Sequence, residues 1–201
     1  MRRQRAAALL AVAALVCVVA PARAARPPGV EQALLAASVL VGPGCSGVLV
    51  DGPDLVLTAE HCIHGGATHT LRFSDGSQRT GWVAGVDHAA DQALLLLEEP
   101  VALKPLMLVR QRPIAGTVLY FAGNPSHPRF QEAKLDRTGR CPSLPSLGNA
   151  LFTTIDGIPG DSGAPIVDGA TRVVGLVHGG AQCHIATPSD TLRRLIADVL
   201  K

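Results

Sequence analysis

Aromatic residues are scarce in this chain, which holds four Phe, one Tyr and one Trp among 201 residues. Basic residues show no concentration outside the first 24 positions, and the 18 Lys and Arg only slightly outnumber the 16 Asp and Glu. Proteins that bind nucleic acid need a basic surface, usually with rings on which bases can stack. The composition therefore argues against nucleic acid as a partner.

No apolar run is long enough to cross a bilayer. The longest, from Ala6 to Ala20, has 15 residues, whereas a membrane-spanning helix needs about 20. Three arginines precede this run, and the small-residue site Ala22-Arg23-Ala24 follows it. This order is typical of an export signal. We predict that residues 1–24 are a signal peptide, that the mature protein is secreted or periplasmic, and that it leaves the membrane once the signal is removed.

Removal of residues 1–24 takes away four arginines and no acidic residue. The mature chain then has 14 basic and 16 acidic residues, a formal net charge of −2. Four cysteines also remain, Cys45, Cys62, Cys141 and Cys183. An even number in an oxidising compartment predicts two disulfides. As a separate expectation, Cys62 bridges back to Cys45 and Cys141 bridges to Cys183, with free thiols as the alternative for the second pair.

Short apolar segments recur about every ten residues and are separated by turn pairs such as Asp75-Gly76. This pattern predicts strands. In the first half they fall at residues 38–41, 47–50, 55–58, 70–73, 81–86 and 92–97. In the second half they fall at residues 117–122, 150–155, 164–167 and 173–178.

Three other segments complete the prediction. Residues 110–116 contain a proline and a glycine and are expected to connect the two halves. The polar residues 125–140, with prolines at 125 and 128, are predicted to be a flexible loop. The chain ends with apolar residues three and four positions apart, from Leu192 to Val199, which predicts an amphipathic helix capped by Ser189 or Asp190.

Ser162 is the candidate nucleophile. A serine hydroxyl keeps its proton near neutral pH, so hydrolases pair it with an imidazole that accepts the proton and a carboxylate that orients the imidazole. Ser162 lies in Gly160-Asp161-Ser162-Gly163, a glycine-flanked turn between predicted strands. Gly160 allows a bend in which the N–H groups of Gly160 and Ser162 form an oxyanion hole, where one donor contributes about 10²- to 10³-fold in rate.

His61 and Asp91 are the candidate partners of the serine. His61 directly follows an apolar strand, and the adjacent Cys62 can tether it to Cys45. Asp91 stands at the start of a buried apolar strand, where a carboxylate needs a partner. His61 can supply that partner.

At these positions the sequence resembles the trypsin-like serine peptidases. Their patterns T-A-A-H-C, D-I-A-L-L and G-D-S-G-G-P correspond here to TAEHC, DQALLL and GDSGAP, in the same order along the chain. The resemblance implies an all-β fold of two packed antiparallel six-stranded barrels with a C-terminal helix. Residues 25–112 would form the barrel with His61 and Asp91, and residues 113–201 the barrel with Ser162.

The resemblance also implies a secreted serine endopeptidase that acts on proteins or peptides through an acyl-enzyme, as a monomer and without a cofactor. Three positions depart from the family pattern. Glu60 replaces a small residue, and its charge is expected either to shift the pKa of His61 or to face solvent. His178 replaces a serine that helps to hold the catalytic aspartate, and Gln92 replaces an apolar residue.

A buried Asp161 needs a cation. Animal family members supply a new N-terminus with the sequence Ile-Val-Gly-Gly, which is absent here. Secreted bacterial members use an internal arginine beside a cysteine, which Arg140-Cys141 resembles. We predict that Arg140 pairs with Asp161 and that no cleavage beyond signal removal is needed.

The same resemblance places the substrate pocket. Asp156, six residues before Ser162, would lie at the pocket base and select Arg or Lys, while His178, Gly179 and Gly180 would form its wall. Asp156 followed by glycine is also a common turn pair, so a purely structural role is the alternative.

Two other functions and a metal site are alternatives to this prediction. A catalytically inactive binding module on the same fold is the main alternative. An α/β-hydrolase or GDSL-type esterase is disfavoured, because Ser162 leads into a strand and not into a helix. His64 lies three residues after His61 without further ligands nearby in sequence, so no metal is expected.

Overall fold

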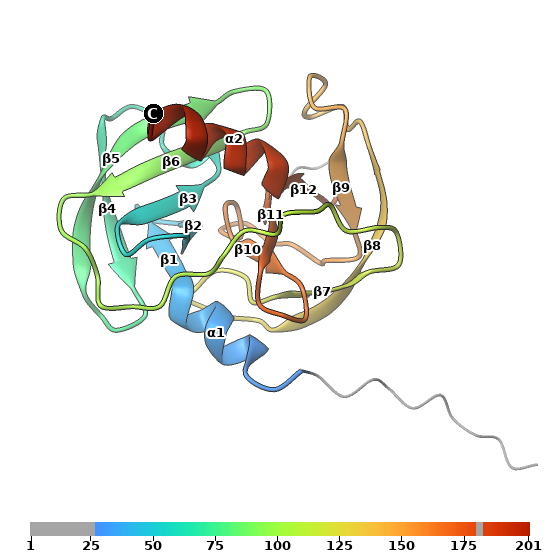
Figure 1. The fold of residues 1–201 in the computed structure, drawn as a ribbon, viewed down its shortest axis with the longest axis horizontal. Coiled ribbons are helices and arrows are strands. Elements are labelled where there is room, and N and C mark those ends of the chain that lie inside the picture. The colour runs from blue at the N-terminus through green and yellow to red at the C-terminus, as the bar shows by residue number, and fades with distance from the viewer. Residues whose placement is uncertain (1–26, 180–182) are drawn as a thin grey trace, which may run out of the picture.

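The computed structural model describes residues 27–179 and 183–201. Two closed antiparallel barrels of six strands each lie side by side, followed by a C-terminal helix (Figure 1). Strand order is β1-β2-β3-β6-β5-β4 in the first barrel and β10-β11-β12-β9-β8-β7 in the second. The predicted all-β fold is confirmed.

The elements have the following bounds. Helix α1 spans Val30–Ala37. The first barrel consists of β1 (Ser38–Val41), β2 (Cys45–Leu49), β3 (Leu55–Thr58), β4 (Thr68–Phe73), β5 (Gln78–Asp87) and β6 (Gln92–Leu97), with the short 3₁₀ helix η1 (Glu60–Cys62) after β3. The second consists of β7 (Val118–Phe121), β8 (Gln131–Gly139), β9 (Ala150–Thr153), β10 (Pro165–Val167), β11 (Val173–Val177) and β12 (Ile185–Pro188), and α2 spans Ser189–Val199.

Strands that are apolar on both faces occupy the middle of the molecule. All four residues of β3 and all five of β11 are buried, because one face lines a barrel interior and the other packs outside the barrel. One apolar cluster joins residues of α1, both barrels and α2, including Leu34, Leu57, Leu176 and Leu192. This shared core explains why the apolar runs of these strands are continuous.

The two barrels are also joined by hydrogen bonds. Ser46 N donates to Ser162 O at 2.8 Å, and the fully buried Gln92 donates from Nε2 to Pro188 O at 3.2 Å. Gln92 therefore uses its polar side chain to connect β6 with the end of β12, at a position where the family pattern has an apolar residue.

The prediction that residues 125–140 form a flexible loop is wrong for β8. Ala133 and Leu135 are buried while Glu132, Lys134 and Asp136 between and beside them are exposed. Only these two side chains of β8 are buried. The strand therefore has alternating buried and exposed residues at its centre, although most of its residues are polar. Helix α1 and strand β12 were also missed by the apolar-run criterion.

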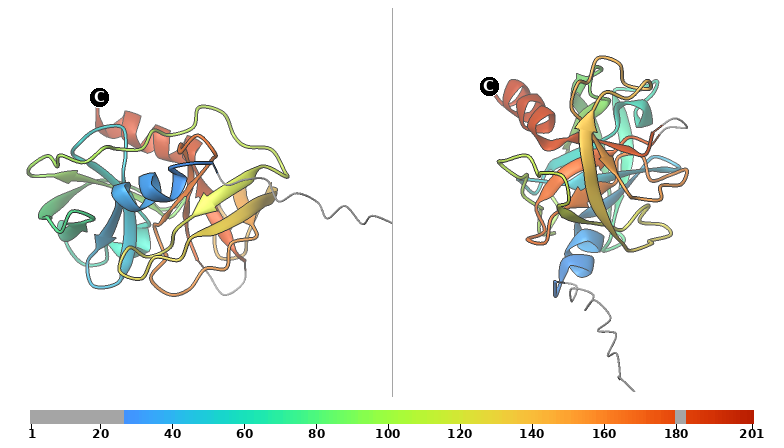
Figure 2. Two further views of the ribbon diagram at one scale, coloured as in Figure 1. Left: turned by 90° about the horizontal axis from the view of Figure 1, so that it is seen from below. Right: turned by 90° about the vertical axis from the view of Figure 1, so that its right-hand side faces the viewer.

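The terminal helix α2 forms as predicted, with a different N-terminus. Neither Ser189 nor Asp190 makes a side-chain capping bond, so the predicted cap is wrong, and Asp190 pairs with Arg112 instead. The helix lies on the outer surface of the first barrel (Figure 2), where a Cβ at Gly85 would come within 2.5 Å of Val199. A side chain at position 85 would therefore push the helix away.

Both predicted disulfides are present. Cys45 is bonded to Cys62, beside His61, and Cys141 is bonded to Cys183, which links the segment after β8 to the segment before β12. No helix within residues 27–179 and 183–201 has the length and apolar character that a membrane span requires. The predicted signal peptide, residues 1–24, lies outside the described residues.

Candidate active site

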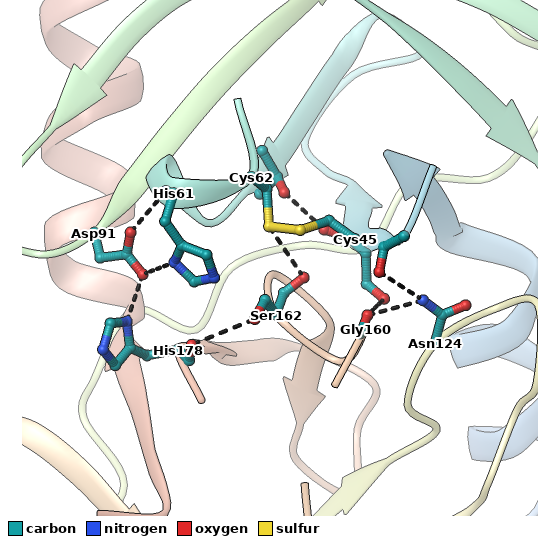
Figure 3. Close-up of a disulfide and its surroundings, with 11 residues drawn as sticks. Cys45, His61, Cys62, Asp91, Asn124, Gly160, Ser162 and His178 are labelled. Carbon is teal, nitrogen blue, oxygen red and sulfur yellow. Dashed lines mark hydrogen bonds and ion pairs between the residues drawn. A yellow bond between two sulfur atoms is a disulfide. The ribbon is translucent and has the colours of Figure 1, made fainter. Parts of the chain in front are cut away.

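His61 and Asp91 form a close pair at the edge of the first barrel (Figure 3). Asp91 Oδ1 accepts a hydrogen bond from the backbone N of His61 at 2.9 Å, and Oδ2 lies 2.8 Å from His61 Nδ1. Asp91 has a φ of 51°, in the left-handed region that non-glycine residues rarely adopt. The turn before β6 thus holds the carboxylate against both polar groups of His61.

A second imidazole reaches the same carboxylate oxygen. His178 Nδ1 lies 2.5 Å from Asp91 Oδ2, and the rings of His61 and His178 are nearly perpendicular, with centroids 5.6 Å apart. His178 follows β11 in the second barrel, so this contact crosses between the barrels. His178 thereby occupies one of the positions at which the Asp91 carboxylate can accept a hydrogen bond.

These contacts set the protonation of the pair. Burial alone would raise the pKa of Asp91, but hydrogen bonds from His178 and His61 outweigh it and lower the pKa to about 2. The hydrogen bond to Asp91 raises the pKa of His61 above 6.5 against the opposing effect of burial. Asp91 is therefore ionised, and it stabilises the imidazolium that a general base becomes.

Glu60 influences the site without entering it. Its charge adds to the raised pKa of His61, and its carboxylate lies 3.1 Å from Nδ1 of the exposed His88. Of the two outcomes expected for Glu60, a shifted pKa of His61 is the one that the geometry favours.

Ser162 lies in the turn between β9 and β10 and faces the His61–Asp91 pair across the barrel junction (Figure 3). Its Oγ donates to His178 O at 3.5 Å, and within the described chain it makes no hydrogen bond to His61. Gly163 N donates to Val177 O at 2.7 Å. A Cβ at Gly163 would lie 2.1 Å from Ser46 O, so only glycine permits this close contact between the barrels.

The backbone beside the serine is oriented by neighbours on both sides. Gly160 has a φ of 98°, and its carbonyl accepts hydrogen bonds from Ser46 Oγ and Asn124 Nδ2, both at 2.8 Å. The N–H groups of Gly160 and Ser162 donate to no acceptor among the described residues. They remain available for a negatively charged oxygen.

Asp161 pairs with Arg129, and the prediction that it pairs with Arg140 is wrong. Arg129 Nη2 lies 2.6 Å from Oδ2 of the buried Asp161, whereas Arg140 donates to Pro145 O. The pairing of β7 with β8 brings Arg129 into place, since Arg129 N donates to Ala122 O at 2.6 Å. Arg129 precedes β8, a strand that the apolar pattern did not predict, so no local motif indicated this arginine.

The carboxylate of Asp161 also accepts two backbone bonds. Oδ1 accepts from Asn124 N at 2.9 Å and Oδ2 from Ile158 N at 2.8 Å. Because Ile158 and Asp161 bracket Gly160, the Arg129–Asp161 ion pair fixes the loop that carries the free N–H groups.

A small cavity of about 60 Å³ lies in the second barrel, and Gly179 in its lining is close to Ser162, since a Cβ at Gly179 would lie 3.5 Å from Ser162 Oγ. Its described lining is mostly apolar and consists of Thr153, Ile155, Gly157, Ile166, Val177, Gly179, Cys183, His184 and Ile185. Asp156 is exposed, and Gln131 binds both its backbone N and its backbone O at 3.0 Å. Of the residues assigned to the pocket from sequence, Gly179 is in this lining, Asp156 and His178 are not, and Gly180 lies outside the described residues.

Comparison with known proteins identifies the class of this fold and site. Residues 45–176 match the family model of the trypsin-like peptidase domain, and the chain belongs to this family of serine hydrolases. The resemblance inferred from the sequence motifs is therefore confirmed.

Individual relatives are distant. Rat serine protease HTR4 is 26% identical over 166 residues, which are 76% of this chain and only 33% of the rat protein. The crystal structure of Deg5 has a TM-score of 0.69 and 22% identity, covering 84% of this chain and 91% of Deg5. The crystal structure of a serine endoprotease from Yersinia pestis has a TM-score of 0.72 and 20% identity, covering 87% of this chain and 67% of the Yersinia chain. These structures show a shared fold.

Proposed function

We propose that this protein is an exported serine endopeptidase in which Ser162, His61 and Asp91 act as the catalytic triad. The observation that carries the proposal is the buried, ionised Asp91 bound to both the backbone and the ring of His61. Membership of a peptidase family implies protein substrates. The two disulfides and the predicted signal peptide support export.

The chemistry follows from the positions of these groups. Ser162 Oγ attacks the carbonyl carbon of the scissile peptide bond as His61 Nε2 takes its proton, and the N–H groups of Gly160 and Ser162 bind the resulting oxyanion. His61 then gives the proton to the leaving amine, which leaves an acyl-enzyme on Ser162. Water, activated by the same imidazole, releases the acid and restores the serine.

A fluorophosphonate probe tests this assignment. We expect one covalent adduct on the exported protein, measured by intact mass, because only an activated serine attacks the phosphorus. The adduct should disappear in Ser162→Ala and persist in Ser126→Ala, which removes an exposed hydroxyl.

The alternative is a catalytically inactive binding module, and one observation favours it. Ser162 Oγ contacts His178 O and not His61, so the nucleophile must rotate before it can react. A folded protein with both disulfides but no adduct would support the binding module.

For specificity, we propose that the enzyme prefers small or medium aliphatic side chains on the acyl side of the cleaved bond. The cavity beside Ser162 is small and lined by Ile155, Ile166, Val177 and Ile185. None of the described residues that line the cavity is acidic, so a Lys or Arg side chain of a substrate would be buried among them without a charged partner, which costs several kcal/mol. The alternative preference, for Arg or Lys, requires that the carboxylate of Asp156 serve as the pocket base.

Peptides that differ only in the residue on the acyl side of the cleaved bond distinguish the aliphatic preference from the preference for Arg or Lys. We expect kcat/KM for Val or Ala to exceed that for Arg or Lys by more than about 100-fold, since each misplaced group in a pocket is worth about 10- to 200-fold. Asp156→Asn should change the ratio between Val and Arg peptides by less than about threefold, as for an exposed residue. Preferential cleavage after Arg that is lost in Asp156→Asn would establish the rival pocket.

A further inference from the structure

Two imidazole nitrogens converge on one carboxylate oxygen at this site. Nδ1 of His61 and Nδ1 of His178 lie 2.8 Å and 2.5 Å from Oδ2 of Asp91, and the three potential ligand atoms lie within 4.8 Å of one another (Figure 3). A hydroxyl or amide at position 178 could also donate to the carboxylate. An imidazole adds a nitrogen that can bind a metal ion.

We propose that His61, His178 and Asp91 form a zinc site whose occupation switches the enzyme off. Two histidines and one carboxylate, with water in the fourth position, are a frequent ligand set for Zn²⁺. At zinc–ligand distances of about 2.0–2.2 Å, tetrahedral neighbours lie about 3.3 Å apart. The two nitrogens must therefore withdraw from Asp91 Oδ2 by less than about 1 Å.

The surroundings allow this movement and favour a cation. The side chain of His61 is 36% exposed, whereas those of His178 and Asp91 are 13% and 5% exposed. Zinc therefore enters from the His61 side, and His61 has room to adjust. The Asp91 carboxylate faces both imidazole rings, and Glu60 places a second carboxyl group on the residue next to His61.

Proton positions explain why zinc would inactivate the enzyme. Without zinc, each Nδ1 shares a proton with Asp91. When zinc binds, Nδ1 gives up that proton to solvent, and a neutral ring carries its single proton on Nε2. His61 Nε2 then has no free lone pair to accept the proton of Ser162 Oγ. This consequence rests on the proposed function, whereas zinc binding itself does not.

Isothermal titration of Ser162→Ala protein, purified after export, tests the site without self-cleavage. We expect one Zn²⁺ per chain. His178→Asn in this background keeps an N–H near the position of Nδ1 but has no imidazole nitrogen, so the affinity should fall at least about tenfold, as even the loss of an outer-shell group costs about 10- to 100-fold. His61→Asn, which removes a half-exposed ligand, should have the same effect. The matched control His64→Asn replaces an exposed histidine nearby and should leave the affinity unchanged.

Activity provides the second readout. Zn²⁺ should inhibit the wild-type enzyme and a chelator should restore it. Absence of one-to-one binding, or a Zn²⁺ affinity in the His61→Asn and His178→Asn variants that is unchanged from that of the Ser162→Ala parent, would overturn the zinc site. Binding by wild-type protein that remains fully active would overturn the switch. A zinc-binding protein without activity in chelator would support the site while contradicting the proposed function.

Discussion

Replacement of Asp91 by Asn should lower kcat by on the order of 10⁴-fold, as expected when a triad histidine is held in the wrong tautomer. The carboxylate accepts from His61 Nδ1 and also from His178 Nδ1. An Asn amide group turned towards His61 donates a proton where one was accepted, so the histidine proton moves to Nε2. His61 then cannot take the proton of Ser162.

Steady-state kinetics with an aliphatic peptide measure this effect, and thermal unfolding shows whether the variant is folded. The matched control is Asp198→Asn, which changes an exposed carboxylate that pairs with Lys201 at the end of α2. Its kcat should stay within about twofold of wild type, as for other surface substitutions. A folded Asp91→Asn protein with kcat within about tenfold of wild type would contradict the triad assignment.

Replacement of Arg129 by Ala should destabilise the protein by about 3–5 kcal/mol, the usual cost of removing one partner of a buried ion pair. Asp161 is 1% exposed and would keep only its bonds from the backbone of Asn124 and Ile158. The loop with the N–H groups of Gly160 and Ser162 should also become less ordered. Arg129→Ala should therefore lower kcat as well as the free energy of unfolding.

Denaturant unfolding of single and double variants tests this pair. Arg140→Ala removes an exposed arginine whose hydrogen bond within the described residues goes to Pro145 O, and it should change the free energy of unfolding by less than about 0.5 kcal/mol. Asp161→Asn added to Arg129→Ala should recover part of the loss, because no unpaired charge then remains buried. Greater destabilisation by Arg140→Ala than by Arg129→Ala would mean that the ion pair is assigned to the wrong arginine.

The pattern of apolar residues along the chain was sufficient to predict a strand where that strand is apolar along its whole length. The strands β3, β6 and β11 were predicted close to their observed bounds because both faces are buried. Strand β8 was missed because only Ala133 and Leu135 face inward. A strand with one solvent-facing side and few apolar residues resembles a polar loop to any criterion based on apolar runs.

The sequence by itself indicated the protein family, since the motifs around His61, Asp91 and Ser162 resemble those of the trypsin-like peptidases, and the even number of cysteines predicted two disulfides. Tertiary structure decided which charged groups meet. Arg129 reaches Asp161 through β8, and His178 reaches Asp91 across the barrel junction, 87 residues away in the chain. Such contacts depend on strand register and barrel closure, which are set by packing over the whole domain, while a motif records only residues adjacent in sequence.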